Sequence, residues 1–265
     1  MPELPDVEIF KKYFDSTSLH QKIKNVDIKE IAMLGEVSPR SLQVRLKEQQ
    51  FISTLRQGKY LFAKTDDEKW LVLHFGMTGF LKYFKNPDES PEHIRLLIDF
   101  DNKYHLAYDC QRKLGLIDLI NDVHTFIRKK ELGIDPYREK FDFEQFKKIV
   151  KGKRSTVKSV LMDQSLLAGI GNIYSDEISF QAKIHPGSRM KKLSDRDLKI
   201  IYERMKDVLQ TAIDKEADPD QLPDTYLIPY RNPGDSCPIC NGTIQKKTIS
   251  GRSSYFCTKH QKLIQ

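Results

Sequence analysis

The sequence predicts an α+β protein of at least two domains, with a mostly β N-terminal half, a helical region after it and a short metal-binding tail. Three observations lead to this prediction. The chain has 265 residues, which suits two domains better than one. Apolar residues form short runs before about residue 120 and recur at helical spacing after about residue 135. Three of the four cysteines fall in about the last thirty residues.

Composition narrows the class of protein. The chain is 39% hydrophobic and 31% charged with few glycines or prolines, which excludes low-complexity disorder and fibrous repeats. No apolar run is long enough for a membrane helix and no secretion signal precedes the first helix, so we expect an intracellular protein. In that compartment four cysteines do not predict a disulfide framework. The net charge of +7 favours a polyanion as partner.

The N-terminal half begins with one short helix. Val7, Phe10, Tyr13 and Phe14 recur near helical spacing, and Pro5 stands where a helix can begin without losing a hydrogen bond. From residue 23 to about residue 120 short apolar runs alternate with turn residues, and Asp101-Asn102 suits a tight hairpin. The clearest predicted strands are residues 60–64, 71–75, 80–84, 94–100 and 104–108. The pattern predicts a β-sandwich or a flattened barrel.

The second region is helical. Phe143, Phe146 and Ile149 share one helical face, and a shorter apolar pattern covers residues 157–161. The clearest helix starts after Ser194, whose hydroxyl can cap it together with Asp197. The apolar stripe of this helix consists of Leu198, Ile201, Met205, Val208, Leu209 and Ala212. Near residue 215 the pattern fades, and prolines break regular structure before the cysteine-bearing tail.

The tail predicts a zinc site. Cys237-x2-Cys240 and Cys257-x2-His260 form two close pairs of ligands sixteen residues apart, a spacing typical of tetrahedral Zn²⁺ bound at the turns of a β-hairpin. We therefore expect one structural Zn²⁺ per chain. Between the pairs lies a cationic stretch that ends at Arg252, and it can reach a phosphate backbone.

The N-terminus carries a candidate nucleophile. Methionine is normally trimmed before a small residue, and the new terminus at Pro2 would be a secondary amine. An α-amino group has a pKa of about 7.7–8.0 against about 10.4 for lysine, so a far larger fraction of it is unprotonated near neutral pH. Glu3 stands beside it and can supply or accept protons. Acidic residues are common after an initiator methionine, so these two residues alone remain a weak indication.

Several blocks together resemble one family over the whole chain. MPELPDVE at the N-terminus, Gly58-Lys59-Tyr60-Leu61, and the segments 74–79 and 163–174 are similar to blocks of the formamidopyrimidine-DNA glycosylase family, which includes the endonuclease VIII branch. Gly251-Arg252-Ser253 before Cys257 resembles the zinc finger of that family. The resemblance implies three parts: an N-terminal catalytic β-sandwich domain over residues 1–130, a helix-two-turn-helix domain over 131–230 and a zinc-finger β-hairpin over 231–265.

The resemblance also implies an activity. Members of this family are base-excision repair enzymes, DNA glycosylases that are also AP lyases, and their substrate is damaged double-stranded DNA. By this resemblance Pro2 would attack C1′ of the damaged nucleotide and form a Schiff base, and Glu3 would donate a proton during ring opening. Lys59 would assist β-elimination and Arg252 would assist δ-elimination. The chain would act as a monomer and would need no membrane.

The remaining contacts would hold a duplex from which one base is extracted. Met77 would fill the gap in the stack, and Arg112 would stand opposite the orphaned base. Asn172, with the nearby amides at its helix start, would bind a phosphate. The other residues implied to contact DNA are His74, His93, Lys153 and Lys158.

Three departures from the family pattern stand out. His260 occupies the place of a usual fourth cysteine, Leu114 that of a phenylalanine, and Cys110 that of an aspartate. The resemblance also implies that members that excise 8-oxoguanine well carry a long loop between the last large helix and the zinc finger, which closes over the flipped purine. The corresponding interval here, 216–236, is short and proline-rich, so we expect a broad lesion spectrum in which formamidopyrimidines and oxidised pyrimidines are excised at least as well as 8-oxoguanine. Two alternatives stay open: a non-catalytic zinc-finger DNA-binding protein, and a chain that retains Met1 and binds lesions without cutting.

Overall fold

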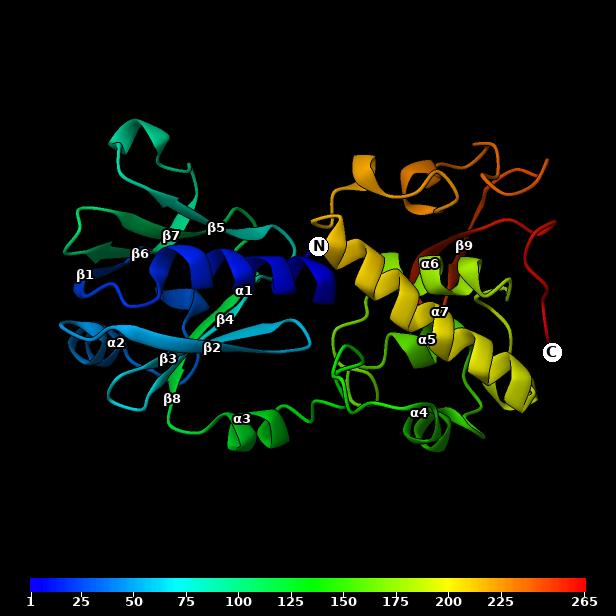
Figure 1. The fold of residues 1–265 in the computed structure, drawn as a ribbon, viewed down its shortest axis with the longest axis horizontal. Coiled ribbons are helices and arrows are strands. Elements are labelled where there is room, and N and C mark those ends of the chain that lie inside the picture. Colours follow the sequence, from blue (N-terminus) through cyan, green and yellow to red (C-terminus); the bar gives the residue numbers. More distant parts are fainter. The chain divides into compact units, whose positions relative to one another are not determined.

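The computed structural model describes residues 1–265 and divides into two units (Figure 1). The first unit contains residues 1–2 and 6–130, and the second contains residues 3–5 and 131–265. Three residues near the N-terminus therefore belong to the unit formed by the C-terminal half. No helix of the structure is both long and apolar enough to span a bilayer.

The first unit is built around two four-stranded antiparallel sheets. One sheet has the order β1-β6-β7-β5 and the other the order β2-β3-β4-β8. The strands are β1 (Ile23–Ile28), β2 (Phe51–Gln57), β3 (Tyr60–Thr65), β4 (Trp70–His74), β5 (Gly79–Phe84), β6 (Ile94–Phe100), β7 (His105–Cys110) and β8 (Leu116–Ile120). The helices are α1 (Leu4–Ser18), α2 (Pro39–Leu46) and α3 (Val123–Lys129), and short 3-10 turns are η1 (Ile31–Met33) and η2 (Pro87–Glu89).

Buried side chains of both sheets form one core, which confirms a sandwich. Leu61 and Leu73 of the second sheet pack in the same cluster as Ile98 and Leu106 of the first, and α1 contributes Phe14. A smaller cluster on the second sheet packs against α3. Residues 79–82 at the start of strand β5 alternate between buried and exposed, as expected of a half-buried strand. The turn at residues 101–104 closes the hairpin of β6 and β7, as predicted.

The second unit is mainly helical. Its helices are α4 (Phe143–Val150), α5 (Val157–Leu161), α6 (Asn172–Gln181) and α7 (Asp195–Asp214), and its 3-10 turns are η3 (Met190–Lys192), η4 (Pro219–Gln221) and η5 (Ile228–Tyr230). The capping box predicted at Ser194 is present, since its side chain accepts the Asp197 N–H and the Asp197 side chain accepts the Ser194 N–H. The predicted apolar stripe of α7 is buried in the core of this unit.

The tail contains an antiparallel hairpin of β9 (Gln245–Ile249) and β10 (Arg252–Phe256). Ser250 and Gly251 form its two-residue turn and have φ values of 52° and 73°, as a type I′ turn requires. A small cluster that includes Phe180, Leu227 and Cys237 packs beneath the hairpin. The α+β class is confirmed, whereas the domain limits named above stay predictions.

Candidate active site

Glu3 is held in place by backbone hydrogen bonds. Its carboxylate is fully buried at the N-terminus of α6 and accepts three backbone N–H groups. Oε2 accepts the Gly171 N–H at 2.7 Å and the Tyr174 N–H at 3.3 Å, and Oε1 accepts the Ile173 N–H at 2.8 Å. A helix N-terminus favours a negative charge because its first N–H groups have no partner in the helix.

This arrangement corrects one detail expected from the sequence. The amides at the start of α6 were expected to bind a phosphate together with Asn172, and they bind Glu3 instead. The glycine at position 171 is the helix N-cap and has no side chain to satisfy these donors, so the carboxylate takes the place of a capping side chain. Asn172 remains available through its side chain, whose Oδ1 is buried without a hydrogen-bond partner.

Pro2 lies directly before the residues that the second unit holds. It is partly exposed, and Met1 before it is 47% exposed. The Leu4 N–H donates to the Gly169 carbonyl at 3.0 Å, and the Leu4 side chain is buried in the core of the second unit. Removal of Met1 would therefore expose an amine whose next two residues are fixed by hydrogen bonds and burial.

Lys59 is presented by the turn between β2 and β3. Gly58 has a φ of 58°, a left-handed conformation that costs glycine little. The buried guanidinium of Arg56 braces this turn, since its Nη1 donates to the Gly58 carbonyl at 3.1 Å and its Nε lies 2.5 Å from a Glu8 carboxylate oxygen. The position of the Lys59 backbone is thus fixed by an ion pair with α1 that the sequence did not indicate.

His74 ends strand β4 and is held as a neutral imidazole. Its Nδ1 accepts the Gly76 N–H at 3.3 Å, which leaves Nε2 as the protonated donor atom. Burial, together with the charges of Lys59 and Lys130, lowers the pKa of His74 to about 4. A neutral Nε2–H group can donate a hydrogen bond to a phosphate oxygen without adding a charge.

The lowered pKa of His74 predicts a pH dependence of stability. Between pH 6.5 and about 4 the unfolded chain binds a proton on this residue and the folded chain does not. We therefore expect stability present above pH 6.5 to be lost as the pH falls toward 4, by about 2–3 kcal/mol for this group. Urea unfolding of the wild type and of His74→Gln across this range isolates the contribution, because other groups titrate equally in both. Identical slopes for the two proteins would contradict the prediction.

The loops that carry Met77 and Arg112 lie against each other within the first unit. The Arg112 N–H donates to the Thr78 hydroxyl at 3.1 Å, and a Cβ on Gly76 would lie 2.5 Å from the Leu114 carbonyl carbon. Only glycine allows this approach, and its φ of 57° is also left-handed. Met77 is 38% exposed and Leu114 53% exposed, so two apolar side chains project beside the arginine. The structure brings these three predicted positions together.

Two further residues fix the Arg112 loop. Arg95 of β6 donates from Nε to the Cys110 carbonyl at 2.9 Å, and Glu30 pairs with Lys113 at 2.5 Å. Cys110, where the family usually has an aspartate, is fully buried. Sequence reasoning missed Arg95 and Glu30, because neither stands in a motif and both contacts join residues far apart in the chain.

The remaining predicted DNA contacts differ in their surroundings. His93 is partly exposed just before β6, its backbone N–H donates to Asp109 and its Nε2 lies 3.9 Å from Glu92. Lys153 is exposed after α4. Lys158, by contrast, is fully buried and its Nζ lies 2.6 Å from an Asp176 oxygen. Its ammonium therefore has no exposed surface from which to contact a phosphate in this structure, contrary to the expectation.

Three of the four predicted metal ligands lie together. The sulfur atoms of Cys237, Cys240 and Cys257 are all within 4.8 Å of one another, and the last two are 3.7 Å apart. A Cβ on Gly242 would lie 2.6 Å from the Cys257 sulfur and 3.2 Å from the Cys240 sulfur, so the turn leaves room for the thiols only with glycine there. The cluster of sulfurs suits a soft or borderline metal ion.

His260 is not part of this group of sulfur atoms. Its Nε2 lies 3.1 Å from the Phe180 carbonyl oxygen, and its ring packs on the Phe180 ring with 4.6 Å between centroids. Burial lowers the pKa of His260, which favours the neutral imidazole that a metal requires. The structure thus brings together three of the four predicted ligands, and it directs one nitrogen of His260 to a carbonyl.

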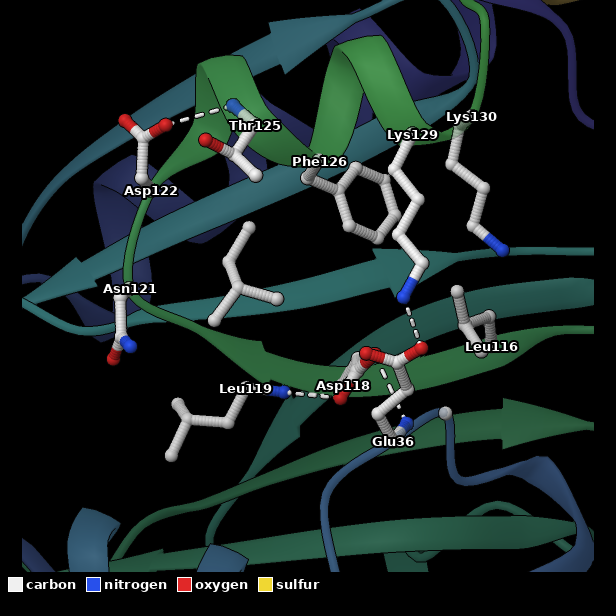
Figure 2. A pocket seen from close by; sticks show the side chains of 12 residues that line it. Glu36, Leu116, Asp118, Leu119, Asn121, Asp122, Thr125, Phe126, Lys129 and Lys130 are labelled. Atoms are coloured by element: carbon white, nitrogen blue, oxygen red, sulfur yellow. Dashed lines mark hydrogen bonds and ion pairs between the residues drawn. The ribbon is translucent and has the colours of Figure 1, made fainter.

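A cavity of about 500 Å³ lies elsewhere in the first unit, between β8 and α3 (Figure 2). Phe126 and Leu116 line it, and Lys129 pairs with Glu36 across it. The Asp118 carboxylate accepts backbone N–H groups and Asp122 caps α3, so both acids are already used by the fold. None of the predicted site residues lines this cavity, and we therefore assign no chemistry to it.

Comparison with known proteins matches most of the chain to one enzyme family. Residues 1–117 match the formamidopyrimidine-DNA glycosylase N-terminal domain, and residues 132–222 match the H2TH domain of the same enzymes. A formamidopyrimidine-DNA glycosylase of Streptococcus pyogenes serotype M28 is 32% identical over 276 residues, which cover 99% of each chain. The chain belongs to the formamidopyrimidine-DNA glycosylase family.

Solved structures of this family show the same fold. A complex between the Lactococcus lactis Fpg protein and DNA containing an abasic site has a TM-score of 0.89 and 28% identity, and covers 98% of this chain and 99% of the other. A mutant of the Lactococcus lactis protein in complex with DNA containing Fapy-dG has a TM-score of 0.89 at 29% identity, with 98% and 100% coverage. The helical part of the second unit is therefore the family's H2TH domain, as the resemblance implied.

Proposed function

We propose that this member of the family removes oxidised bases from double-stranded DNA and then cleaves the abasic strand by β,δ-elimination. The chain is a base-excision repair DNA glycosylase with AP lyase activity. One observation supports the assignment of residues: the residue that follows Pro2 in the chain is a buried glutamate whose carboxylate is held by three N–H donors. The enzyme acts as a monomer, inside the cell where the genome resides.

The chemistry follows from the properties of these two residues. The amine of Pro2, once Met1 is removed, attacks C1′ of the damaged nucleotide, and the base leaves with the bonding electrons of the glycosidic bond. The attacking nitrogen passes its proton to the Glu3 carboxylate, which returns that proton to the ring oxygen as the bond between C1′ and the ring oxygen breaks. The nitrogen thereby forms an iminium with C1′, a covalent intermediate that acidifies the C2′ protons, and Lys59 assists the β-elimination that follows. Arg252, exposed at the start of β10, assists the δ-elimination.

Substrate binding combines phosphate contacts with a wedge. His74 offers a neutral donor, the Asn172 side chain an amide, and Arg252 a cation, while His93 and Lys153 add contacts to the backbone. Met77, Arg112 and Leu114 project together and can fill the space left by an extruded base. Phosphate contacts of this kind predict binding that weakens with salt.

The proposed role of Met77 as a wedge predicts that its replacement affects a duplex substrate more than a single-stranded one. Replacing Met77 by alanine is expected to slow excision from a duplex by about 10–100-fold, because a few kcal/mol of lost stacking are no longer replaced. Cleavage of a single-stranded abasic oligonucleotide needs no wedge and should change little. Single-turnover assays on both substrates test this, and Val44→Ala on α2, which removes another exposed apolar side chain, is the control. Equal losses on both substrates would show that Met77 serves the fold instead.

The sulfur cluster in the tail would hold one structural Zn²⁺. Cys237, Cys240 and Cys257 supply three ligands, and His260 supplies the fourth through Nδ1, because its Nε2 is directed to the Phe180 carbonyl. A carbonyl partner of this type fixes the tautomer and the orientation of a histidine ligand. The ion would order the hairpin that carries Arg252, since so short a tail has little core of its own.

Zinc content tests this ligand set. We expect one Zn²⁺ per freshly purified chain, and we expect His260→Ala to weaken retention by about 100-fold or more, since the loss of an outer partner alone costs about 10–100-fold. Gly242→Ala should also release the ion, because the new methyl group meets the Cys257 sulfur. Asn241→Ala, at the exposed neighbouring position, is the matched control. Elemental analysis after a chelator challenge gives the answer, and purified wild type without zinc would contradict the site.

A lesion panel tests the function as a whole. Duplexes containing a formamidopyrimidine, 5-hydroxycytosine or 8-oxoguanine opposite cytosine are incubated with excess enzyme, and the rate of strand incision is measured. We expect incision of all three, with the first two processed at least as fast as 8-oxoguanine. Binding without incision of any lesion would instead indicate a non-catalytic DNA-binding protein.

A further inference from the structure

Asp176 of α6 is the centre of a buried polar cluster that no catalytic step uses. Its Oδ1 lies 2.6 Å from Lys158 Nζ and accepts the Ser254 hydroxyl at 2.6 Å. Its Oδ2 accepts Arg231 Nη2 at 2.8 Å and the Tyr255 backbone N–H at 3.1 Å. One carboxylate thus joins α5, α6, the segment after η5 and strand β10.

Breaking this cluster costs free energy because its charged groups are buried away from solvent. Asp176, Lys158 and Ser254 are fully buried, and the Arg231 guanidinium packs over the Tyr255 ring at 4.7 Å. Burial lowers the pKa of Lys158, and the Asp176 charge opposes that shift. Removing one partner from such a pair leaves an uncompensated charge in the interior. Two of the four contacts, those from Ser254 and Tyr255, therefore hold β10 on α6, and the other two neutralise the carboxylate that they share.

Hydrogen bonds hold the chain on both sides of Arg252. Ser254 is two residues after Arg252, so both side chains lie on the same face of β10. Two residues before Arg252, the Ser250 hydroxyl lies 2.8 Å from the hydroxyl of Thr156, the N-cap of α5. The strand that carries Arg252 is thus attached to the helical part of the second unit on both sides of the arginine. Fixing these two points fixes where the Arg252 side chain starts and which way it leaves the strand.

We propose that Asp176 is a positioning residue for δ-elimination, acting through its bond to Ser254 to hold Arg252 in register with the H2TH helices. This inference rests on the proposed role of Arg252. It gives Lys158 and Arg231 a defined function as well: they neutralise Asp176 and keep it in place, in keeping with the full burial of Lys158. A displacement of about 1 Å at a reacting group can cost about 100-fold in rate.

The test separates β-elimination from δ-elimination on a preformed abasic site. The full-length variants Asp176→Asn and Ser254→Ala are compared with wild type under single-turnover conditions, and the β and β,δ products are separated by gel electrophoresis. Ser254→Ala removes one hydroxyl and leaves the three other contacts of Asp176, so it serves if Asp176→Asn is unstable. Ser253→Ala, the exposed neighbour on the opposite face of β10, is the matched control.

We expect both variants to accumulate the β product, with the ratio of β to β,δ product raised about tenfold or more, while the β-elimination rate, the zinc content and the affinity for an abasic-site duplex stay within about threefold of wild type. A general loss of structure would lower both steps and the affinity together. An unchanged product ratio in Ser254→Ala, or in a folded, zinc-loaded Asp176→Asn, would overturn the proposal.

Arg252→Ala, measured in parallel, tests the role of Arg252 in δ-elimination independently of the positioning role of Asp176. If it leaves the product ratio unchanged, the proposed role of Arg252 is wrong and the positioning role falls with it. If Arg252→Ala raises the ratio and the Asp176 and Ser254 variants do not, Arg252 acts in δ-elimination and its position is set by other contacts.

Discussion

Borohydride added to the enzyme and an abasic-site duplex is expected to trap a covalent complex on Pro2, and a chain that keeps Met1 is expected to trap none. The iminium has a reducible C=N bond, whereas the nitrogen of Pro2 in a peptide bond with Met1 is not a nucleophile. The yield of trapped complex and the incision rate should both fall by about a thousandfold or more, as expected when a covalent nucleophile is removed.

The control for this experiment is to determine whether Met1 is present at the N-terminus and which residue carries the adduct. Intact mass spectrometry distinguishes chains with and without Met1, and peptide mapping locates the reduced adduct. Lys59→Met should still form an adduct at Pro2, because the lysine acts after the covalent bond. Equal trapping by a chain that retains Met1 would show that another amine, of a lysine or of Met1 itself, is the nucleophile, and would overturn the central assignment.

Replacement of Glu3 by glutamine is expected to remove most base excision, by about 10²–10⁴-fold, because the proton donor is lost. Incision of a preformed abasic site should be less affected, since the glycosidic bond is already broken there. The substitution also has a structural cost. The three N–H groups of residues 171, 173 and 174 all need an acceptor, and the amide –NH₂ of glutamine offers a donor in place of one oxygen.

That cost can be measured separately. A buried donor left without a partner costs about 1–3 kcal/mol, so the melting temperature should fall in Glu3→Gln. Glu3→Asp retains the carboxylate on a side chain that is shorter by one methylene. We expect it to lose base excision, with a change in melting temperature that differs from that of Glu3→Gln. Excision and lyase activity on matched duplexes, together with thermal unfolding, distinguish the two effects. Excision at the wild-type rate in Glu3→Gln would exclude Glu3 as the proton donor.

Local patterns in the sequence predicted part of the fold well. The start of α7 at Ser194, the turn between β6 and β7, and the hairpin of the tail each depend on residues close together in the chain, and all three are confirmed. Strands β1, β2 and β8 were not located individually, because their mixed polar and apolar residues give no clear alternation. Helices α2 and α3 were missed for a similar reason, since they are short and lie within a β-rich region.

The site was predictable where a motif marks it and not where the fold assembles it. Pro2, Lys59 and Arg252 follow from the resemblance and remain predictions, whereas the contacts that orient them could not be read from the sequence. Asp176 meets Ser254 across 78 positions, and Glu3 meets Gly171 across 168. Lys158 shows the same limit, because the sequence alone does not distinguish a buried lysine that pairs with an acidic residue from a lysine on the surface.

The attachment of Glu3 to the second unit has a consequence for biosynthesis. Residues 3–5 are translated long before residues 171–174, whose N–H groups hold Glu3. At about 5–20 residues per second, the N-terminal end waits on the order of ten to thirty seconds for its partners. During that interval an exposed amine at Pro2 would exist without a fixed carboxylate beside it. The reactive pair is therefore assembled only in chains that have been translated past α6, so prematurely terminated fragments carry the nucleophile without its proton donor in place.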